Sequence, residues 1–89
     1  MSYTVLLHPK AADALSKIDE PNHSAIRNRL KELKESPENS GTRLKETRFW
    51  RTRVDDYRAV YEIKPVEEQV IVLFIGHRRN VYDDFSKLI

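Results

Sequence analysis

Hydrophobic and polar positions follow two different periods along the chain. Residues 3–7, YTVLL, are apolar and β-branched, which predicts a first strand. Two later groups of apolar residues recur at the spacing of one helical face: Ala11, Leu15 and Ile18, and then Ile26, Leu30 and Leu33. They predict a hairpin of two helices, the first beginning near Pro9 and the second running from Pro21 to the Ser36-Pro37 pair.

The second half of the chain alternates like β-structure. A loop at residues 37–42, PENSGT, separates it from the helices. Strands are expected near residues 48–54, 57–64 and 69–75, with turns at Asp55-Asp56 and at residues 64–68. The last strand, QVIVLFI, is apolar at every position but its first and is therefore expected to be the most buried.

The end of the chain returns to helical spacing. Val81, Phe85 and Leu88 suggest a short C-terminal helix. A chain of 89 residues is long enough for one modest core and too short for two. We therefore expect one domain over residues 1–89.

Composition removes several classes of chemistry. The chain has no cysteine, which excludes disulfides, thiol nucleophiles and cysteine-based zinc sites, and fits a reducing compartment. No signal-peptide pattern or membrane span is visible, so a soluble, cytoplasmic protein without membrane contact is expected. The net charge of +2 is too small to argue nucleic-acid binding. Evidence for nucleic-acid binding has to come from the distribution of the charged residues along the chain.

Three arginines stand out in the run FWRTRVDDYRAVYE, residues 49–62. With Asp55-Asp56 as a two-residue loop, Arg53 pairs with Arg58, and Arg51 shares their face. The opposite face is the natural one for the helices to cover: Trp50, Thr52, Val54, Tyr57, Ala59, Tyr61 and Ile63.

This arginine face has two readings. It can be an ordinary solvated face whose charge is balanced by Asp55, Asp56 and Glu62. However, like charges directly opposite each other destabilise a hairpin, and a bound polyanion relieves that conflict. Arginine is always charged and holds phosphate oxygens with two parallel hydrogen bonds, so the sequence favours the polyanion.

A second basic segment, GHRRNVYDDF, follows the last strand at residues 76–85. His77, Arg78, Arg79 and Tyr82 lie close together in it and could converge on the arginine face. Histidine suits proton transfer near neutral pH, although such a residue is more often a solvated or capping side chain. Tyr82 is most simply a packing residue, but a tyrosine beside arginines can stack on a base.

Taken together, RFWRTRVDDYRAVYEI at residues 48–63 and IGHRRNVYDDF at residues 75–85 resemble the RelE/ParE toxin superfamily, and the resemblance covers nearly the whole chain. It implies a small α+β fold, an antiparallel sheet with the helical hairpin on one face and a basic groove on the other. RelE-like members are ribosome-dependent endoribonucleases that cut mRNA in the A site. They use the substrate 2′-hydroxyl as nucleophile, need no metal or other cofactor, and are inhibited by an antitoxin.

The resemblance also implies roles for single residues. Arg58 and Arg78 match arginines that stabilise the phosphate, and Tyr82 matches a tyrosine that stacks on the base. Arg51 and Arg53 replace two lysines of RelE. Because arginine cannot lose its proton, they should bind RNA backbone, as should Arg79. This leaves His77 as the first candidate for proton transfer, with Glu46 as a weaker candidate for the general base.

Two other functions remain open from the sequence. ParE-like members share the fold and inhibit DNA gyrase without nuclease activity. A degenerate, non-toxic domain could bind only an antitoxin and act as a co-repressor. In every case the expected partner is a RelB-like antitoxin, with operator DNA bound only by the toxin-antitoxin complex and with ribosome and mRNA as partners of a nuclease.

Overall fold

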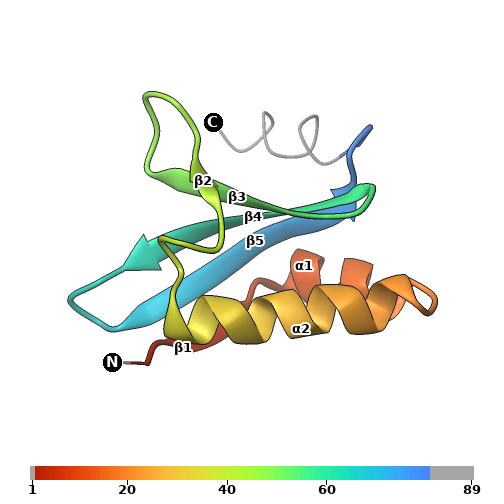
Figure 1. The fold of residues 1–89 in the computed structure, drawn as a ribbon, viewed down its shortest axis with the longest axis horizontal. Coiled ribbons are helices and arrows are strands. Elements are labelled where there is room, and N and C mark those ends of the chain that lie inside the picture. Colours follow the sequence, from red (N-terminus) through yellow and green to blue (C-terminus); the bar gives the residue numbers. More distant parts are fainter. Residues whose placement is uncertain (1, 81–89) are drawn as a thin grey trace.

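A five-stranded sheet with both helices on one face forms the molecule (Figure 1). The computed structural model describes residues 2–80. The elements, in chain order, are β1 (Thr4–Leu7), α1 (Pro9–Ser16), α2 (Asn22–Glu35), β2 (Thr42–Arg43), β3 (Phe49–Val54), β4 (Tyr57–Lys64) and β5 (Gln69–His77). Across the sheet the strand order is β1-β5-β4-β3-β2.

The predicted α+β class is confirmed, with one difference in the sheet. Strands β3 to β5 pair antiparallel, as expected, and so does the short β2, which the sequence did not predict, but β1 runs parallel to β5. Parallel neighbours need a long connection between them, and here the chain passes through both helices and three strands before β5 forms. The sheet is therefore mixed rather than wholly antiparallel. The predicted C-terminal helix falls on residues 81–89, outside the described residues.

Local sequence signals set the ends of both helices. Pro9 occupies the first turn of α1, and the His8 Nδ1 accepts a hydrogen bond from the Lys10 N–H. At the start of α2, the Glu20 carboxylate accepts hydrogen bonds from the Ser24 N–H at 2.8 Å and from the Ser24 hydroxyl at 2.6 Å. These bonds lower the pKa of Glu20, because they stabilise its charged form. Helix α2 ends at Glu35, before the predicted Ser36-Pro37 stop.

The apolar core lies mainly between the helices and the sheet. Its buried members come from both helices and from β4 and β5: Ala11, Leu15, Ile26, Leu30, Leu33, Ala59, Tyr61, Val70, Val72 and Ile75. A smaller buried cluster of Phe49, Val60 and Phe74 lies on the other face of the sheet. Both faces are thus partly apolar. Within residues 2–80 no helix is long and apolar enough to cross a membrane.

A β-bulge in β5 changes which side chains face the helices. Tyr61 pairs with Val72, whereas the preceding Val60 pairs with Phe74, so Leu73 is an extra residue. After the bulge the alternation is shifted by one position. His77 therefore pairs with Tyr57 and lies on the helix-covered side of the sheet.

Candidate functional site

The predicted register of the β3–β4 hairpin is confirmed. Val54 pairs with Tyr57 across the Asp55-Asp56 turn, and Arg53 pairs with Arg58. Asp55 takes a φ of 54°, in the left-handed region that aspartate tolerates better than most residues. Because side chains alternate along a strand, Arg51, Arg53 and Arg58 project to the face opposite the helices.

Arg58 is not on an open patch, as the sequence had suggested. Only 6% of the Arg58 surface is exposed. One terminal nitrogen, Nη1, donates to the Asp55 carbonyl at 3.0 Å and to the Tyr57 carbonyl at 3.0 Å. The guanidinium is therefore fixed by the hairpin turn. Within residues 2–80 no carboxylate forms an ion pair with it, although buried charges in proteins are usually paired.

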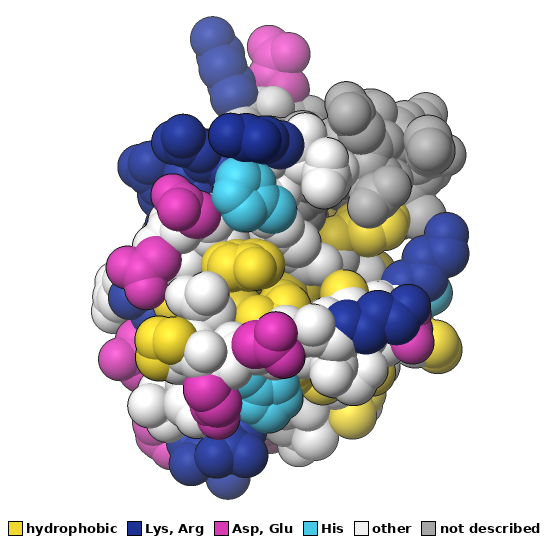
Figure 2. All heavy atoms as spheres, turned by 90° about the vertical axis from the view of Figure 1, so that its right-hand side faces the viewer, with side chains coloured by type: hydrophobic (Ala, Val, Ile, Leu, Met, Phe, Trp, Pro, Cys, Tyr) yellow, Lys and Arg dark blue, Asp and Glu magenta, His cyan; other side chains and the backbone are white. Residues whose placement is uncertain are grey.

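Further arginines lie at the same end of the sheet. The Arg78 N–H donates to the Asp56 carbonyl at 2.8 Å, which ties the segment after β5 to the turn. Arg53, Arg78 and Arg79 are exposed. Figure 2 shows Lys and Arg side chains gathered over this end of the molecule, beside a histidine. We call Arg53, Arg58, Arg78 and Arg79 the arginine cluster.

The structure does not place His77 on the arginine face. Its ring contacts the Tyr57 ring edge-on, with centroids 5.8 Å apart, on the helix-covered side. Its Nδ1 accepts a hydrogen bond from the Arg79 N–H at 3.2 Å. In the neutral ring the proton is then on Nε2, which can donate. His77 thus adjoins the arginine cluster from the other side of the sheet, because the bulge at Leu73 shifts the alternation.

Two other candidates are not brought to this end. Glu46 is exposed in the loop before β3, with a φ of 62°, whereas Arg53 lies near the end of the same strand. Tyr82 lies outside the described residues. Among residues 2–80, no three His, Asp or Glu side chains come together in a way that could hold a metal ion.

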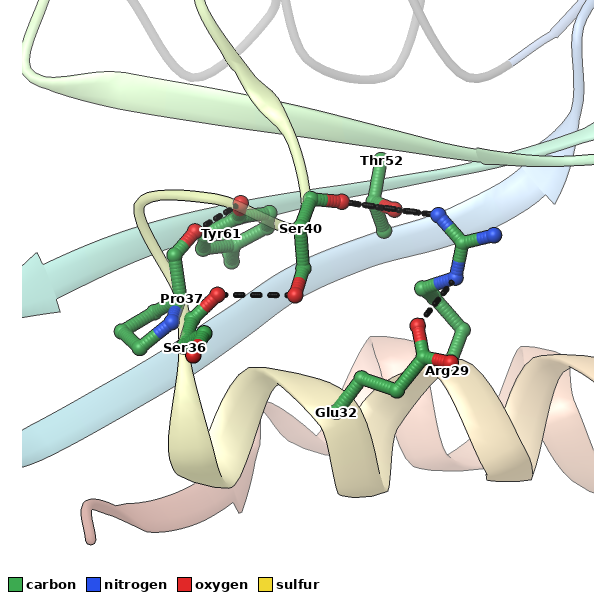
Figure 3. Close-up of polar contacts among 7 residues, drawn as sticks. All are labelled: Arg29, Glu32, Ser36, Pro37, Ser40, Thr52 and Tyr61. Atoms are coloured by element: carbon green, nitrogen blue, oxygen red, sulfur yellow. Dashed lines mark hydrogen bonds and ion pairs between the residues drawn. The ribbon is translucent and has the colours of Figure 1, made fainter.

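A polar network fastens the hairpin to α2 and to the loop after it (Figure 3). Arg29 Nη1 donates to the Thr52 hydroxyl at 3.1 Å, and that hydroxyl donates to the Ser40 carbonyl at 2.7 Å. The buried Tyr61 hydroxyl donates to the Pro37 carbonyl at 2.7 Å. Burial raises the pKa of Tyr61 to about 12. No local sequence pattern marks this network, because its partners are 12 to 24 residues apart in the chain.

Gly41 sits where this loop approaches the hairpin most closely. A Cβ at this position would lie 2.2 Å from the Tyr61 Oη and 2.5 Å from the Arg51 carbonyl oxygen. The only sequence signal was a glycine in a predicted loop. It is the close backbone approach, and not an unusual φ, that requires glycine here.

The chemistry available to the arginine cluster is recognition of phosphate. Guanidinium groups donate several hydrogen bonds in a fixed plane and stay charged at any physiological pH. Arg58 is pre-positioned by the turn, while Arg53 and Arg78 lie on the two segments beside it. Such fixed donors can stabilise charge that develops on a phosphate in a transition state.

The known proteins that this chain is similar to are toxins of toxin-antitoxin systems. Residues 5–82 match the family described as ParE toxin of type II toxin-antitoxin system, parDE. No curated protein matches the chain. Three solved structures illustrate the similarity.

In the RelBE2 toxin-antitoxin complex from Mycobacterium tuberculosis, the similar chain is 25% identical, with a TM-score of 0.78 over 88% of this chain and 100% of that one. A mutant of the E. coli toxin RelE in the free state gives 22% identity and a TM-score of 0.80, over 100% of this chain and 99% of that one. The chromosomal ParDE system from P. aeruginosa gives 15% identity and a TM-score of 0.67, over 85% and 96%.

The last two likenesses show the fold alone, which is the fold that the sequence pattern predicted. The family match is stronger, because it takes in the helical hairpin, the arginine hairpin and the segment after β5. By this match the chain belongs to the ParE toxin family of type II toxin-antitoxin systems.

Proposed function

We propose that this toxin is a ribosome-dependent endoribonuclease that cleaves mRNA in the A site, without a metal ion, by attack of the substrate 2′-hydroxyl on the adjacent phosphate. One observation carries the proposal. Arg58 is buried, is bonded to two backbone carbonyls, and has no ion-pairing carboxylate within residues 2–80. A bound anion would stabilise a buried guanidinium that has no such carboxylate, and phosphate is an anion that arginine binds well.

In this proposal the arginine cluster supplies binding and charge stabilisation. Arg58 and Arg78 hold the scissile phosphate and stabilise the charge that it gains in the transition state. Arg51, Arg53 and Arg79 hold the RNA backbone. Tyr82 stacks on a base next to the cut, as expected from the sequence resemblance.

Proton transfer falls to His77 in the same proposal. The Arg79 N–H occupies Nδ1, so only Nε2 is available to exchange a proton with the substrate. The ring adjoins the end of β5, one residue after Gly76, which pairs with Arg58. Replacing His77 with Gln should slow cleavage in the bound complex far more than it weakens ribosome binding.

A second candidate function is supported by the family match, whose description names ParE toxins. A ParE-like toxin would inhibit DNA gyrase through protein contacts and would cut no RNA. The arginine cluster would then be a protein-binding surface. A third candidate is the non-toxic co-repressor, and no feature of residues 2–80 favours it over the other two.

The partner we propose is a RelB-like antitoxin, since several of the similar solved structures are complexes of a RelE toxin with its RelB antitoxin. The structure offers it a groove of about 410 Å³ between β1 and α2, next to the free edge of β1. Its lining has three apolar residues, Val5, Leu7 and Leu30. It also has three cations, Arg27, Lys31 and Lys34. An acidic segment with apolar side chains matches that surface. Operator DNA would bind only to the toxin-antitoxin complex.

The test is primer extension on a defined mRNA, comparing naked RNA with RNA in a cytoplasmic ribosome whose A site is empty. We expect cuts only in the ribosome. Arg78→Ala is the sharpest loss-of-function variant, because within residues 2–80 Arg78 is bonded to the turn through its backbone alone and the fold should persist. Arg27→Ala, an exposed arginine on α2, removes the same charge away from the cluster and should cut normally.

Two further outcomes decide between the functions. Arg58→Lys keeps the charge but loses the planar donor pair, and it should cut far more slowly than wild type. If wild type leaves mRNA intact in the ribosome and inhibits DNA supercoiling by gyrase, the nuclease is rejected in favour of the ParE-like activity.

A further inference from the structure

A small polar pocket lies at the edge of β3 and shares Arg53 with the arginine cluster. Its volume is about 260 Å³. The loop after α2, one turn of α2 and the outer part of β3 contribute its lining: Arg29, Asn39, Ser40, Gly41, Thr42, Arg51, Thr52 and Arg53. We call it the edge pocket. Among residues 2–80, β2 pairs with Trp50 and Arg51, and no strand pairs with the part of β3 after Arg51 on that side.

The lining of the edge pocket is cationic and polar. Three of its residues are arginines, and none is acidic. Its other side chains are hydroxyls and one amide, and Gly41 leaves backbone exposed. The groove between β1 and α2 also has three cations, but its floor is apolar. The edge pocket therefore suits a ligand that is anionic and polar throughout, not an apolar peptide.

Arg29 is held in place at this pocket. Its Nε forms an ion pair with the Glu32 carboxylate at 2.9 Å, and its Nη1 bonds to Thr52 at 3.1 Å. Figure 3 shows the other terminal nitrogen of Arg29 pointing away from these partners. Because the guanidinium is already fixed, little side-chain entropy is lost when it binds a ligand.

Backbone geometry adds a donor from β3. In an antiparallel pair the backbone groups of successive residues point alternately toward and away from the partner strand. The two-residue turn closes on the Val54–Tyr57 pair, so the N–H and C=O of Arg53 point away from β4, toward the open edge. A backbone N–H beside fixed guanidinium groups is a typical donor for phosphate.

We infer that the edge pocket binds a phosphodiester group of the RNA strand, one that lies outside the cleavage centre. This inference rests on the proposed ribonuclease function and names a second contact with its substrate. Arg53 lines the edge pocket and belongs to the arginine cluster, so it joins the two sites. A single strand that follows β3 from the cluster would place successive phosphates on both.

The first test changes the charge of the pocket without touching its hydrogen-bond network. Asn39→Asp adds a negative charge at an exposed lining position, and Asn28→Asp makes the same change on an exposed face of α2 outside the pocket. Binding of a fluorescent, uncleavable 2′-O-methyl RNA is measured by anisotropy. We expect Asn39→Asp to bind about threefold to fivefold more weakly than wild type, and Asn28→Asp to bind like wild type.

A second measurement identifies the ligand as a backbone phosphate. Loss of one phosphate contact lowers the dependence of log K on log salt by about 0.7 for a single strand. Asn39→Asp should show this smaller slope, and Asn28→Asp should not. Inorganic phosphate should compete only at concentrations well above those of the RNA. Competition by free phosphate at micromolar concentration would overturn the assignment to a diester.

The two proposals fail in different ways. Equal affinities and salt slopes for Asn39→Asp and Asn28→Asp, with normal cleavage by wild type, would reject the edge pocket alone. Absence of cleavage by wild type, with RNA binding still sensitive to Asn39→Asp, would reject the ribonuclease and leave a nucleic-acid site.

Discussion

The two faces of the β3–β4 hairpin come from one alternating sequence and differ in the charge and exposure of their side chains. On the helix-covered face, Thr52, Ala59 and Tyr61 are at most 3% exposed, and the hydroxyls are bonded to the loop after α2. On the outer face, Arg53 is exposed and lies directly opposite Arg58, a like-charge pair that costs stability. This contrast suggests that the helix-covered face stabilises the fold and that the outer face binds the ligand.

This division has a consequence for mutagenesis. Substitutions on the helix-covered face should change the free energy of unfolding, and activity only through it. Substitutions of exposed arginines on the outer face should change RNA binding and leave the free energy of unfolding nearly constant. Single variants with both readouts can test the division.

The largest loss of stability is expected from Gly41→Ala. The added methyl group would overlap the Tyr61 Oη and the Arg51 carbonyl, so the loop or the hairpin must move. Such a shift breaks the Tyr61–Pro37 hydrogen bond, and we expect a cost of about 3 kcal/mol. Urea denaturation measures it. Unchanged stability would mean that the loop is not fixed to the hairpin.

A matched pair of valines compares the faces directly. Val72 and Val60 are both fully buried, Val72 in the main core and Val60 in the small outer cluster. Val72→Ala should cost about 2 kcal/mol, because the surrounding core cannot collapse into the cavity. Val60→Ala should cost about half of that, since its cluster has fewer buried members than the main core within residues 2–80. A larger loss for Val60→Ala in thermal and urea unfolding would reverse the ranking of the faces.

The elements of the fold, and the pairing within the hairpin, could be predicted because they depend on local signals. A two-residue turn and strict alternation fixed the Arg53–Arg58 pair, which the structure confirms. The direction of β1 and the bulge at Leu73 could not be predicted. Strand alternation does not encode which way a neighbour runs, and no residue type in the last strand marks an extra position.

The same limit applies to the candidate site. Its arginines were visible in the sequence, but the burial of Arg58 and its hydrogen bonds to the turn were not. The side of the sheet taken by His77 depended on the bulge. No local pattern singles out Arg29 among the charged residues of α2, and only the packing of α2 on the hairpin brings it to Thr52. Long-range contacts decide each of these points.

Tyr61→Phe is expected to have an intermediate effect at neutral pH. The change removes the hydroxyl that bonds to the Pro37 carbonyl and leaves that buried acceptor unsatisfied, at a cost of about 1 to 2 kcal/mol. Chemical denaturation at pH 7 measures this difference. A variant as stable as wild type would show that the hydroxyl contributes no net stability.

The pH dependence of Tyr61 sharpens this measurement. The unfolded chain loses the phenol proton near pH 10, whereas the folded protein keeps it to about pH 12. Folding therefore binds a proton in this range, and the free energy of unfolding falls as pH rises from 10 to 12, by at most about 1.4 kcal/mol per pH unit. Tyr61→Phe lacks this contribution, so its stability should fall less steeply above pH 10.

The smallest change in stability is expected on the outer face, from Arg53→Gln. Removing one member of the Arg53–Arg58 pair relieves repulsion, so the free energy of unfolding should stay within about 0.5 kcal/mol of wild type and should rise rather than fall. RNA binding should weaken and its salt dependence should decrease, because Arg53 contributes to both the arginine cluster and the edge pocket. Arg48→Gln is the control, since Arg48 is also exposed but lies just before β3 in an ion pair with Glu62. If Arg53→Gln instead unfolded readily and bound RNA normally, the outer face would serve the fold, and the division between the two faces would be wrong.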